Sequence, residues 1–400
     1  MYYHLLPLTL LSASHSFRSL AEPIIQSPLL KNHGALSLAL ETAQLYGLHR
    51  QLVETPSISD SEHAVGEFLA SYLTARNFKV EKQDVPPFDS QGHQTQHQQR
   101  FNLLAYPAAS PSHGTRVLLT AHLDTVPPYI PYHYNSTTRQ ISGRGTVDAK
   151  ACIAAQVTAA ISLLSSGTVP PSSLSLLYVV GEEVGGDGMR AFNNSPHPAY
   201  ETVIFGEPTD LKLASGHKGN LAFTVTATGK CGHSGYPWLG ENANSMLIPA
   251  LLALDNLQLP STDKYGNSTL NIGKMAGGQA GNVIPASAYA DIQVRIAGGE
   301  PKESQDLIVD AVRRVDERLK VQFWSKGYGP VNIDHDVEGF ETMTVNYGTD
   351  IPWLDGQHKR YLYGPGSILD AHSDHEHLSV EDLAKSVEGY KKLVLAALSR

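Results

Sequence analysis

The chain has 400 residues, of which 41% are hydrophobic and 17% are charged. Its formal net charge of -9 and isoelectric point near 6.0 argue against a nucleic-acid-binding protein, which would need a basic face. No apolar stretch reaches the length of a membrane-spanning helix, so we expect no membrane insertion. A chain of this length exceeds what one hydrophobic core usually organises, which predicts two domains.

The N-terminal segment resembles a secretory signal. A short apolar centre, Leu5–Leu11, is followed by small residues, which predicts a signal peptide over residues 1–18 and a secreted protein, although no lysine or arginine precedes that centre. The alternatives are a mitochondrial targeting segment, because Arg18 and several serines precede the first acidic residue, Glu22, or the tail of a cytoplasmic protein.

Sequons and cysteines bear on the same question. Three N-x-[ST] sequons, which are compatible with secretion, predict glycosylation at Asn135, Asn193 and Asn267. The two cysteines, Cys152 and Cys231, are far apart in the sequence, and we expect two buried free thiols rather than a disulfide.

The first part of the chain alternates helical and strand patterns. Residues Ser59–Arg76 are predicted to form a helix opened by a capping box of Ser59 and Glu62, and Ala149–Leu164 is a second helical pattern. The predicted strands are apolar throughout and lie at Phe101–Pro107, Arg116–Asp124, Leu174–Gly181 and Thr202–Gly206. Such strands, separated by helices, indicate a sheet covered on both faces and therefore an α/β domain.

Residues 215–328 follow a different pattern and are predicted to form an inserted domain. We predict strands at Leu221–Gly229, Ser268–Met275, Ala286–Ile296 and Lys320–Trp324, with helices at Asn242–Leu257 and Pro301–Leu319. This βαββαβ order is the ferredoxin-like arrangement. The last helical pattern, Ser379–Leu398, should pack back on the first domain, which would then comprise residues 36–214 and 329–400.

Polar side chains gather where the apolar strands end. His122 and Asp124 close one strand, and further polar groups occur in Gly143–Lys150, Val179–Gly186, Phe205–Asp210 and Gly364–His377. Each segment alone has a plain explanation, such as a hydrogen-bonded histidine, a solvated turn or a helix N-cap. The strands of an open α/β sheet end at one crevice, so together these groups would repel one another unless a cation neutralised them. Nitrogen and oxygen ligands without thiolates suit zinc, with cobalt or manganese as substitutes.

These five segments, in this order and spacing, resemble the co-catalytic zinc exopeptidases of peptidase family M20, which include acetylornithine deacetylase, succinyl-diaminopimelate desuccinylase, aminoacylase and glutamate carboxypeptidase. The resemblance rests on A-H-L-D-T-V-P, G-R-G-T-V-D-A-K and G-E-E and extends over essentially the whole chain after about residue 40. It implies a zinc-exopeptidase-like α/β/α catalytic domain, an inserted ferredoxin-like lid domain for dimerisation, and two Zn²⁺ ions per subunit.

The resemblance also implies a role for each polar residue. The metal ligands would be His122, Asp148, Glu183, Glu207 and His372. Asp148 would bridge both ions, Glu183 and His372 would complete one of them, and Glu207 the other. Asp124 would orient His122 from behind, and Glu182, adjacent to a ligand, is the candidate general base and acid.

The sequence departs from the family pattern at two places. Ala151 stands where relatives usually have glycine, so the helix after Asp148 could start differently. His375 stands where an aspartate is expected, which puts the local hydrogen bonding in doubt. His375 and His377 are therefore alternatives to His372 as the metal ligand.

The lid supplies the candidate substrate-binding residues. In the family the histidine of G-H-S-G-Y-P, here His233, stabilises the oxyanion, often from the lid of the partner subunit, so a homodimer through the lid is expected. Asn282 and Arg295 match lid positions that hold the substrate, and Arg295 could grip a terminal carboxylate, although an exposed strand position is the alternative. Gly366 is expected to lie in a loop that lines the same pocket.

These observations predict a secreted zinc carboxypeptidase that acts on peptides. An intracellular deacylase that acts on N-acyl amino acids is the first alternative, and cleavage of the chain near residues 13–20 would favour secretion. A metal-bound, inactive peptide-binding relative is the second alternative. The presence of Glu182 with all five ligand positions weighs against it.

Overall fold

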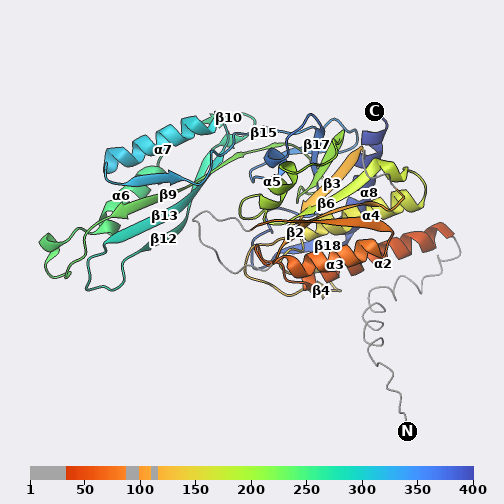
Figure 1. Cartoon of the computed structure of the whole chain (residues 1–400), viewed down its shortest axis with the longest axis horizontal. Coiled ribbons are helices and arrows are strands. Elements are labelled where there is room, and N and C mark those ends of the chain that lie inside the picture. The colour runs from red at the N-terminus through yellow and green to blue at the C-terminus, as the bar shows by residue number, and fades with distance from the viewer. Residues whose placement is uncertain (1–32, 87–98, 110–115) are drawn as a thin grey trace, which may run out of the picture.

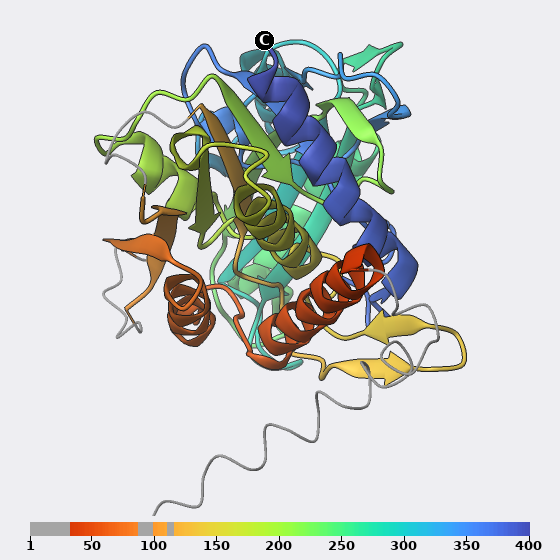
Figure 2. The same cartoon turned by 90° about the vertical axis from the view of Figure 1, so that its right-hand side faces the viewer.

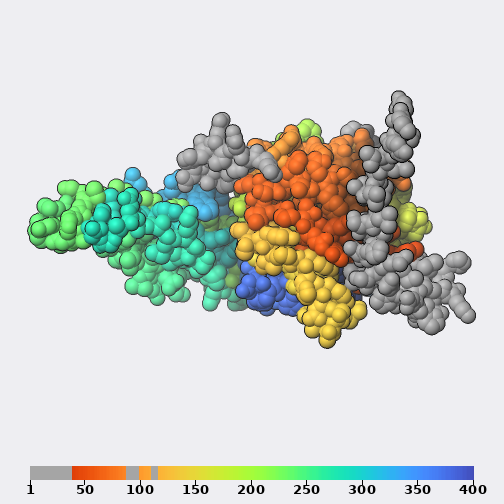
Figure 3. Space-filling view, turned by 90° about the horizontal axis from the view of Figure 1, so that it is seen from below, coloured from red at the N-terminus to blue at the C-terminus, as the bar shows by residue number. Residues whose placement is uncertain are grey.

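The computed structural model describes residues 33–86, 99–109 and 116–400. It has a large domain and a lid domain that projects from it as a narrower arm (Figures 1 and 3). The predicted signal peptide lies outside the described residues. In the part of the chain that is described, no helix combines the length and the apolar character needed to cross a bilayer.

The large domain is built on a six-stranded sheet with the order β1-β2-β6-β3-β7-β17. These strands are β1 (Phe78–Asp84), β2 (Phe101–Pro107), β3 (Val117–His122), β6 (Leu174–Val179), β7 (Thr202–Gly206) and β17 (Lys359–Tyr363). Strands β6, β3, β7 and β17 run parallel, whereas β1 and β2 pair antiparallel at one edge. The parallel strands therefore end at one edge of the sheet, where the sequence predicted that polar groups would gather.

Helices cover the two faces of this sheet unequally. One face carries α2 (His33–Glu54), α4 (Lys150–Ser165) and α8 (Val380–Leu398), which lie side by side in Figure 2, and α3 (His63–Thr74) packs near β1 and β2. The other face is covered by the short helix α5 (Asp187–Asn193) and by a small sheet of β15 (Val331–Asn332), β8 (Leu213–His217) and β16 (Thr342–Val345). The predicted α/β/α class is confirmed.

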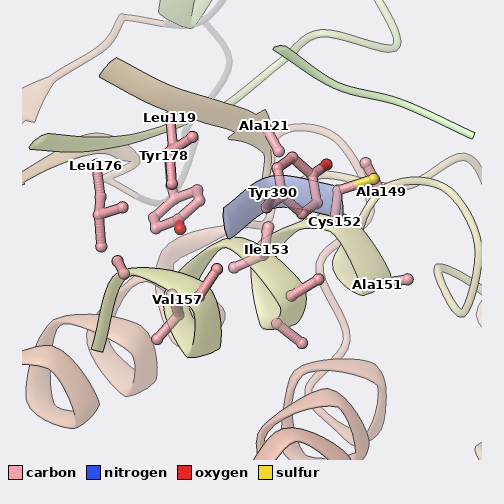
Figure 4. Packing of buried hydrophobic residues seen from close by; sticks show 14 of the residues in the cluster. Leu119, Ala121, Ala149, Ala151, Cys152, Ile153, Val157, Leu176, Tyr178 and Tyr390 are labelled. Atoms are coloured by element: carbon pink, nitrogen blue, oxygen red, sulfur yellow. The ribbon is translucent and has the colours of Figure 1, made fainter. Parts of the chain in front are cut away.

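Helix α4 approaches the sheet closely because its buried side chains are small. Figure 4 shows the Tyr390 ring of α8 beside Cys152 and Ile153 of α4, near Ala121 of the sheet. A Cβ atom at Gly206, the last residue of β7, would lie only 2.7 Å from the Cβ atom of Cys152. Glycine is therefore required at this position, and the close packing fixes the position of Glu207, the next residue.

The lid has the predicted ferredoxin-like topology. Its elements are β9 (Gly219–Thr228), α6 (Ala243–Asp255), β12 (Thr269–Gly277), β13 (Ser287–Ile296), α7 (Pro301–Val315) and β14 (Lys320–Phe323). The antiparallel sheet has the order β12-β13-β9-β14, and both helices lie on one face of it (Figure 1). Their apolar sides form a second core with the sheet, separate from that of the large domain.

Several elements were not predicted from the sequence. These are α2, α5, the strands β1, β8, β15, β16 and β17, the short strands β4 (His133–Asn135), β5 (Gln140–Ser142), β10 (Ser261–Thr262), β11 (Gly266–Asn267) and β18 (His377–Ser379), and the 3-10 turns η2 (Pro171–Ser173), η3 (Pro237–Leu239) and η4 (Ile351–Trp353). Strands β18, β5 and β4 form one further small sheet.

Two local predictions were wrong. The predicted capping box does not form, because α3 begins at His63 and the Ser59 hydroxyl donates instead to the carboxylate of Asp124. Both cysteines are free thiols, but only Cys152 is buried, since Cys231 is exposed on the lid.

Candidate active site

His122 is the last residue of β3, and both nitrogens of its buried ring have a defined neighbour. Nδ1 lies 3.0 Å from the main-chain oxygen of Asp124 and 3.6 Å from its Oδ1 atom, while Nε2 lies 2.9 Å from Oδ1 of Asp148. An Nδ1–H group that donates to Asp124 leaves the lone pair of Nε2 directed at Asp148. This is the tautomer that binds a metal through Nε2.

Asp124 also holds the loop that carries two neighbouring glutamates. Its Oδ1 atom accepts a hydrogen bond from the N–H of Glu182 at 3.1 Å, and its Oδ2 atom accepts one from the N–H of Glu183 at 3.2 Å. The Ser59 hydroxyl donates to Oδ2 at 2.8 Å. One fully buried carboxylate therefore positions His122 and the Glu182–Glu183 turn together.

The two oxygens of the Asp148 carboxylate face different histidines. Oδ1 faces Nε2 of His122, whereas Oδ2 lies 3.2 Å from Nε2 of His372. His372 also lies 3.0 Å from Oε2 of Glu183, and Oε1 of Glu207 lies 3.9 Å from Nε2 of His122. Two donor groups that share Asp148 result, one with His122 and Glu207 and the other with His372 and Glu183, as the family resemblance implied.

Electrostatics show that this cluster needs positive charge. Burial raises the pKa of Glu182 and of Glu207 well above the usual range. The Glu207 carboxylate adds to the upward pKa shift of Glu182, and the Asp148 carboxylate adds to that of Glu207. Burial and the neighbouring Asp148 carboxylate also raise the pKa of Glu183. For Asp148 burial acts in the same direction, but the contacts with the His122 and His372 rings outweigh it and lower the pKa.

The donor set fits divalent cations. The ligand atoms of His122, Asp148 and Glu183 lie within 4.8 Å of one another, and so do those of His122, Glu182 and Glu207. The donors are imidazole nitrogens and carboxylate oxygens, a set that suits metal ions with open coordination positions. Two divalent cations would neutralise carboxylates that otherwise take up protons.

A cleft of about 600 Å³ opens from this cluster between the large domain and the lid. Asp148, Glu182, Glu183, Glu207 and His372 line one end, and Arg295 of β13 lines the lid side. Four aromatic side chains also line the cleft, those of Trp324, Tyr328, Tyr347 and Trp353. An extended ligand bound along this cleft would lie next to Glu182.

Three other predicted residues do not line this cleft. His233 and Asn282 lie together in the lid, where the N–H of Ser234 donates to the main-chain oxygen of Asn282 at 3.0 Å. Gly366 has a positive φ of 78°, and a Cβ atom there would lie 3.0 Å from Val147, so its loop packs behind the Asp148 segment.

Of the three candidate histidines that follow β17, His372 alone joins the cluster among the described residues. His375 is exposed and pairs with Asp374 at 2.9 Å, and His377 lies 3.8 Å from Asp370. His372 itself has a positive φ of 62°, and hydrogen bonds to Asp148 and Glu183 raise its pKa to about 10.

Glu376 is a positioning residue that the sequence reasoning missed. Its Oε1 atom accepts hydrogen bonds from the N–H groups of Val147 at 2.9 Å and Asp148 at 3.3 Å, and its Oε2 atom lies 2.7 Å from Nη1 of Arg144. Glu376 and Arg144 are both almost fully buried. Glu376 therefore connects the His372 loop to the Asp148 loop, a role that the unusual His375 leaves intact.

Comparison with known proteins agrees with this fold. The Peptidase dimerisation domain model matches residues 215–320, and the Peptidase family M28 model matches residues 103–228. A probable carboxypeptidase of Aspergillus oryzae is 47% identical over 412 aligned residues, which cover 95% of this chain and 94% of that protein.

Solved structures share the fold at low sequence identity. A dipeptidase of Saccharomyces cerevisiae aligns with a TM-score of 0.75 at 14% identity, covering 91% of this chain and 98% of that one. An M20 family metallo-carboxypeptidase of Sulfolobus solfataricus aligns with a TM-score of 0.69 at 15% identity, covering 89% and 99%. A dinuclear metal-binding M20 peptidase of Bacillus subtilis aligns with a TM-score of 0.60 at 16% identity, covering 90% and 99%.

The cluster of histidines and carboxylates at the sheet edge, under an inserted lid, defines a metal-dependent peptide hydrolase. The chain belongs to the M20 family of metallopeptidases.

We predict that Glu376→Gln weakens metal binding by about 10–100-fold, because the Asp148 loop loses its anionic acceptor. The free energy of unfolding should fall by about 3–5 kcal/mol, since Arg144 becomes a buried charge without a partner. Zinc titration against a competing chelator and urea unfolding of the metal-free protein measure the two effects separately.

Asp374→Asn is the matched control, because the Asp374 side chain is 97% exposed and its pair with His375 lies on the surface. An Arg144→Met/Glu376→Gln double variant should regain stability but not metal affinity. Equal metal affinities for Glu376→Gln and Asp374→Asn would contradict the positioning role.

Proposed function

We propose that this metallopeptidase is a carboxypeptidase that releases C-terminal residues from peptides. Arg295 carries the proposal, because it lines the cleft without a hydrogen bond or ion pair to any residue in the described part of the chain. Arg295 belongs to the lid but reaches the large domain, because its Nη1 atom would lie 3.1 Å from a Cβ atom placed at Gly348. A guanidinium offers two parallel N–H groups, which match the carboxylate at the end of a peptide.

Zinc is the proposed cofactor, with two ions per subunit and with cobalt or manganese as substitutes. One ion would be held by His122, Glu207 and one oxygen of Asp148. The other would be held by His372, Glu183 and the second Asp148 oxygen. Three protein ligands per ion leave positions for water and substrate, which is the pattern of catalytic rather than structural zinc.

The side chains of the cleft divide the work of hydrolysis. When bound, a pair of zinc ions polarises the scissile carbonyl and lowers the pKa of the attacking water. Glu182 takes the proton from that water and delivers it to the departing amine nitrogen, which requires a carboxylate beside both groups. Asp124 keeps this carboxylate in place through the N–H of Glu182, and Arg295 holds the C-terminal carboxylate at a fixed distance from it.

The lid is proposed to form a homodimer. Strand β12 is an exposed sheet edge, and α6 exposes Ile248 and Leu252, one helical turn apart, at 56% and 64%. In the dimer we expect His233 and Asn282 to enter the cleft of the partner subunit, since they lie outside the cleft of their own chain. His233 would then stabilise the oxyanion of the partner's substrate.

Secretion is proposed from the N-terminal segment and the sequons. Asn135 and Asn267 are exposed and are the proposed glycosylation sites. Asn193 is less suited, because its Nδ2 donates to Oδ2 of Asp355 at 3.0 Å and its Oδ1 accepts from the N–H of Asp355 at 2.8 Å.

The carboxypeptidase proposal predicts that zinc-loaded protein hydrolyses N-blocked dipeptides with a free C-terminus and that the corresponding amides are poor substrates. Arg295→Met should lower kcat/KM on the free dipeptides by about 100-fold, because a charged hydrogen-bond pair is lost, and should leave the slow rate on the amides unchanged. Liquid chromatography of the released amino acid measures both rates. Faster turnover of N-acetyl amino acids than of blocked dipeptides would favour the deacylase, and normal activity of Glu182→Ala would overturn the assignment of the general base.

Subunit complementation tests the dimer and the role of His233 together. Glu182→Ala and His233→Ala proteins should each be inactive, yet a refolded mixture should regain about one quarter of the wild-type activity, because mixed dimers contain one complete site. A mixture that stays inactive, although mixed dimers are detected by native mass spectrometry, would show that His233 acts within its own chain.

Expression in a eukaryotic secretory host tests secretion. We expect the protein in the medium to begin near residues 13–20 and to carry glycans at Asn135 and Asn267, as measured by mass spectrometry of the N-terminus and of glycopeptides. Intracellular protein that retains Met1 would contradict this proposal.

A further inference from the structure

The active-site cleft contains a second guanidinium, that of Arg190 in α5, which the proposed mechanism does not use. Its Cζ atom lies 3.6 Å from the centroid of the Trp353 ring, so the aromatic face supports the plane of the guanidinium. No hydrogen bond or ion pair joins its side chain to another residue of the described chain, and its Nε atom is buried without a partner.

The acidic groups closest to Arg190 do not satisfy it. Asp187 is bonded to Arg100 instead, and Asp350 is buried without lining the cleft. Neither forms an ion pair with Arg190 within 4.0 Å among the described residues. The Nε–H donor of Arg190 is buried without an acceptor within the described chain, and the half-buried guanidinium lines the cleft, which fits an acceptor that arrives with a ligand.

Arg190 and Arg295 lie at two ends of one aromatic floor. The Trp353 ring, on which Arg190 stacks, meets the Tyr328 ring edge to face at a centroid distance of 5.3 Å. Tyr328 and Arg295 meet at Gly348, where a Cβ atom would lie 2.3 Å from the Tyr328 hydroxyl and 3.1 Å from Nη1 of Arg295. The floor thus runs from one guanidinium to the other.

We propose that this pair of arginines selects peptides whose C-terminal residue is aspartate or glutamate. Arg295 binds the α-carboxylate, and Arg190 binds the side-chain carboxylate across the floor of Trp353 and Tyr328. The inference rests on the proposed carboxypeptidase function and adds the class of the released residue. A neutral C-terminal side chain would leave the Arg190 donors without an acceptor. Selectivity for acidic residues therefore comes from weaker binding of neutral residues as well as from the ion pair with an acidic one.

The test compares glutamate with glutamine at the C-terminus, because the two side chains have the same shape and differ in charge. The substrates are benzyloxycarbonyl-Ala-Glu, benzyloxycarbonyl-Ala-Gln and benzyloxycarbonyl-Ala-Leu, and the protein is the zinc-loaded full chain. We expect wild-type kcat/KM to be at least about 10-fold higher for the glutamate substrate.

Arg190→Met keeps the length of the side chain and its packing on Trp353 but removes the charge. It should lower kcat/KM on the glutamate substrate by about 30-fold and change the other two rates by less than about threefold. Arg190→Lys should lie between wild type and Arg190→Met. The control is Arg314→Met on the exposed side of α7, which should change none of the three rates.

Two results would overturn the inference. The first is equal wild-type kcat/KM on the glutamate and glutamine substrates. The second is a uniform loss of kcat/KM on all three substrates in Arg190→Met protein that still binds zinc, which would show that Arg190 only stabilises the local structure. Failure of the proposed function gives a different result, namely no difference between free C-termini and C-terminal amides for any residue.

Discussion

The structure depends on the repulsion among buried carboxylates at the end of one sheet. Asp124, Asp148, Glu182, Glu183 and Glu207 converge with His122 and His372 at the point where parallel strands end. Desolvated carboxylates at this separation favour protonation, and without cations burial raises the pKa values of three of them. Divalent cations would neutralise these carboxylates, so we expect metal binding to stabilise this edge of the sheet.

The backbone around the cluster is held by carboxylates that do not face the cleft. Asp124 accepts the N–H groups of Glu182 and Glu183, and Glu376 accepts those of Val147 and Asp148. Each anion fixes a segment that carries ligands, and a charged acceptor forms stronger hydrogen bonds than a neutral one. The ligands are thus placed by hydrogen bonds to their main chain, which leaves their side chains free to approach metal and substrate.

The sequence predicted the features that depend on local patterns. Apolar runs located the central strands, and the polar residues that follow them predicted a cluster of histidines and carboxylates, because strand ends in a parallel sheet necessarily meet. The ferredoxin-like order of the lid could also be predicted, because the spacing of its hydrophobic residues distinguishes strands from helices. These inferences needed only the period of the hydrophobic residues and the geometry of an open sheet.

Features that depend on contacts between distant segments were not predictable. Ser59 has the spacing of a helix cap, yet its hydroxyl donates to Asp124, 65 residues away. Glu376 lies between two histidines that attracted attention as ligands, and its role becomes evident only when its loop meets Val147, 229 residues away. Arg190 sits in a short helix where an arginine is normally solvated, and only the contact with Trp353 places it in the cleft.

The division of the cleft between two domains connects recognition to chemistry. The ligands, Glu182 and Arg190 belong to the large domain, whereas Arg295 belongs to the lid. The two domains are joined by crossing segments that pack tightly, since a Cβ atom at Gly219 would lie 2.1 Å from the main-chain oxygen of Tyr328. At the same junction the ring of His217 lies 3.1 Å from the Thr349 hydroxyl and meets Tyr328 edge to face. Tyr328, which forms part of the cleft floor, therefore also packs at the junction between the two domains. Its packing sets the distance between Arg295 and the cluster of histidines and carboxylates.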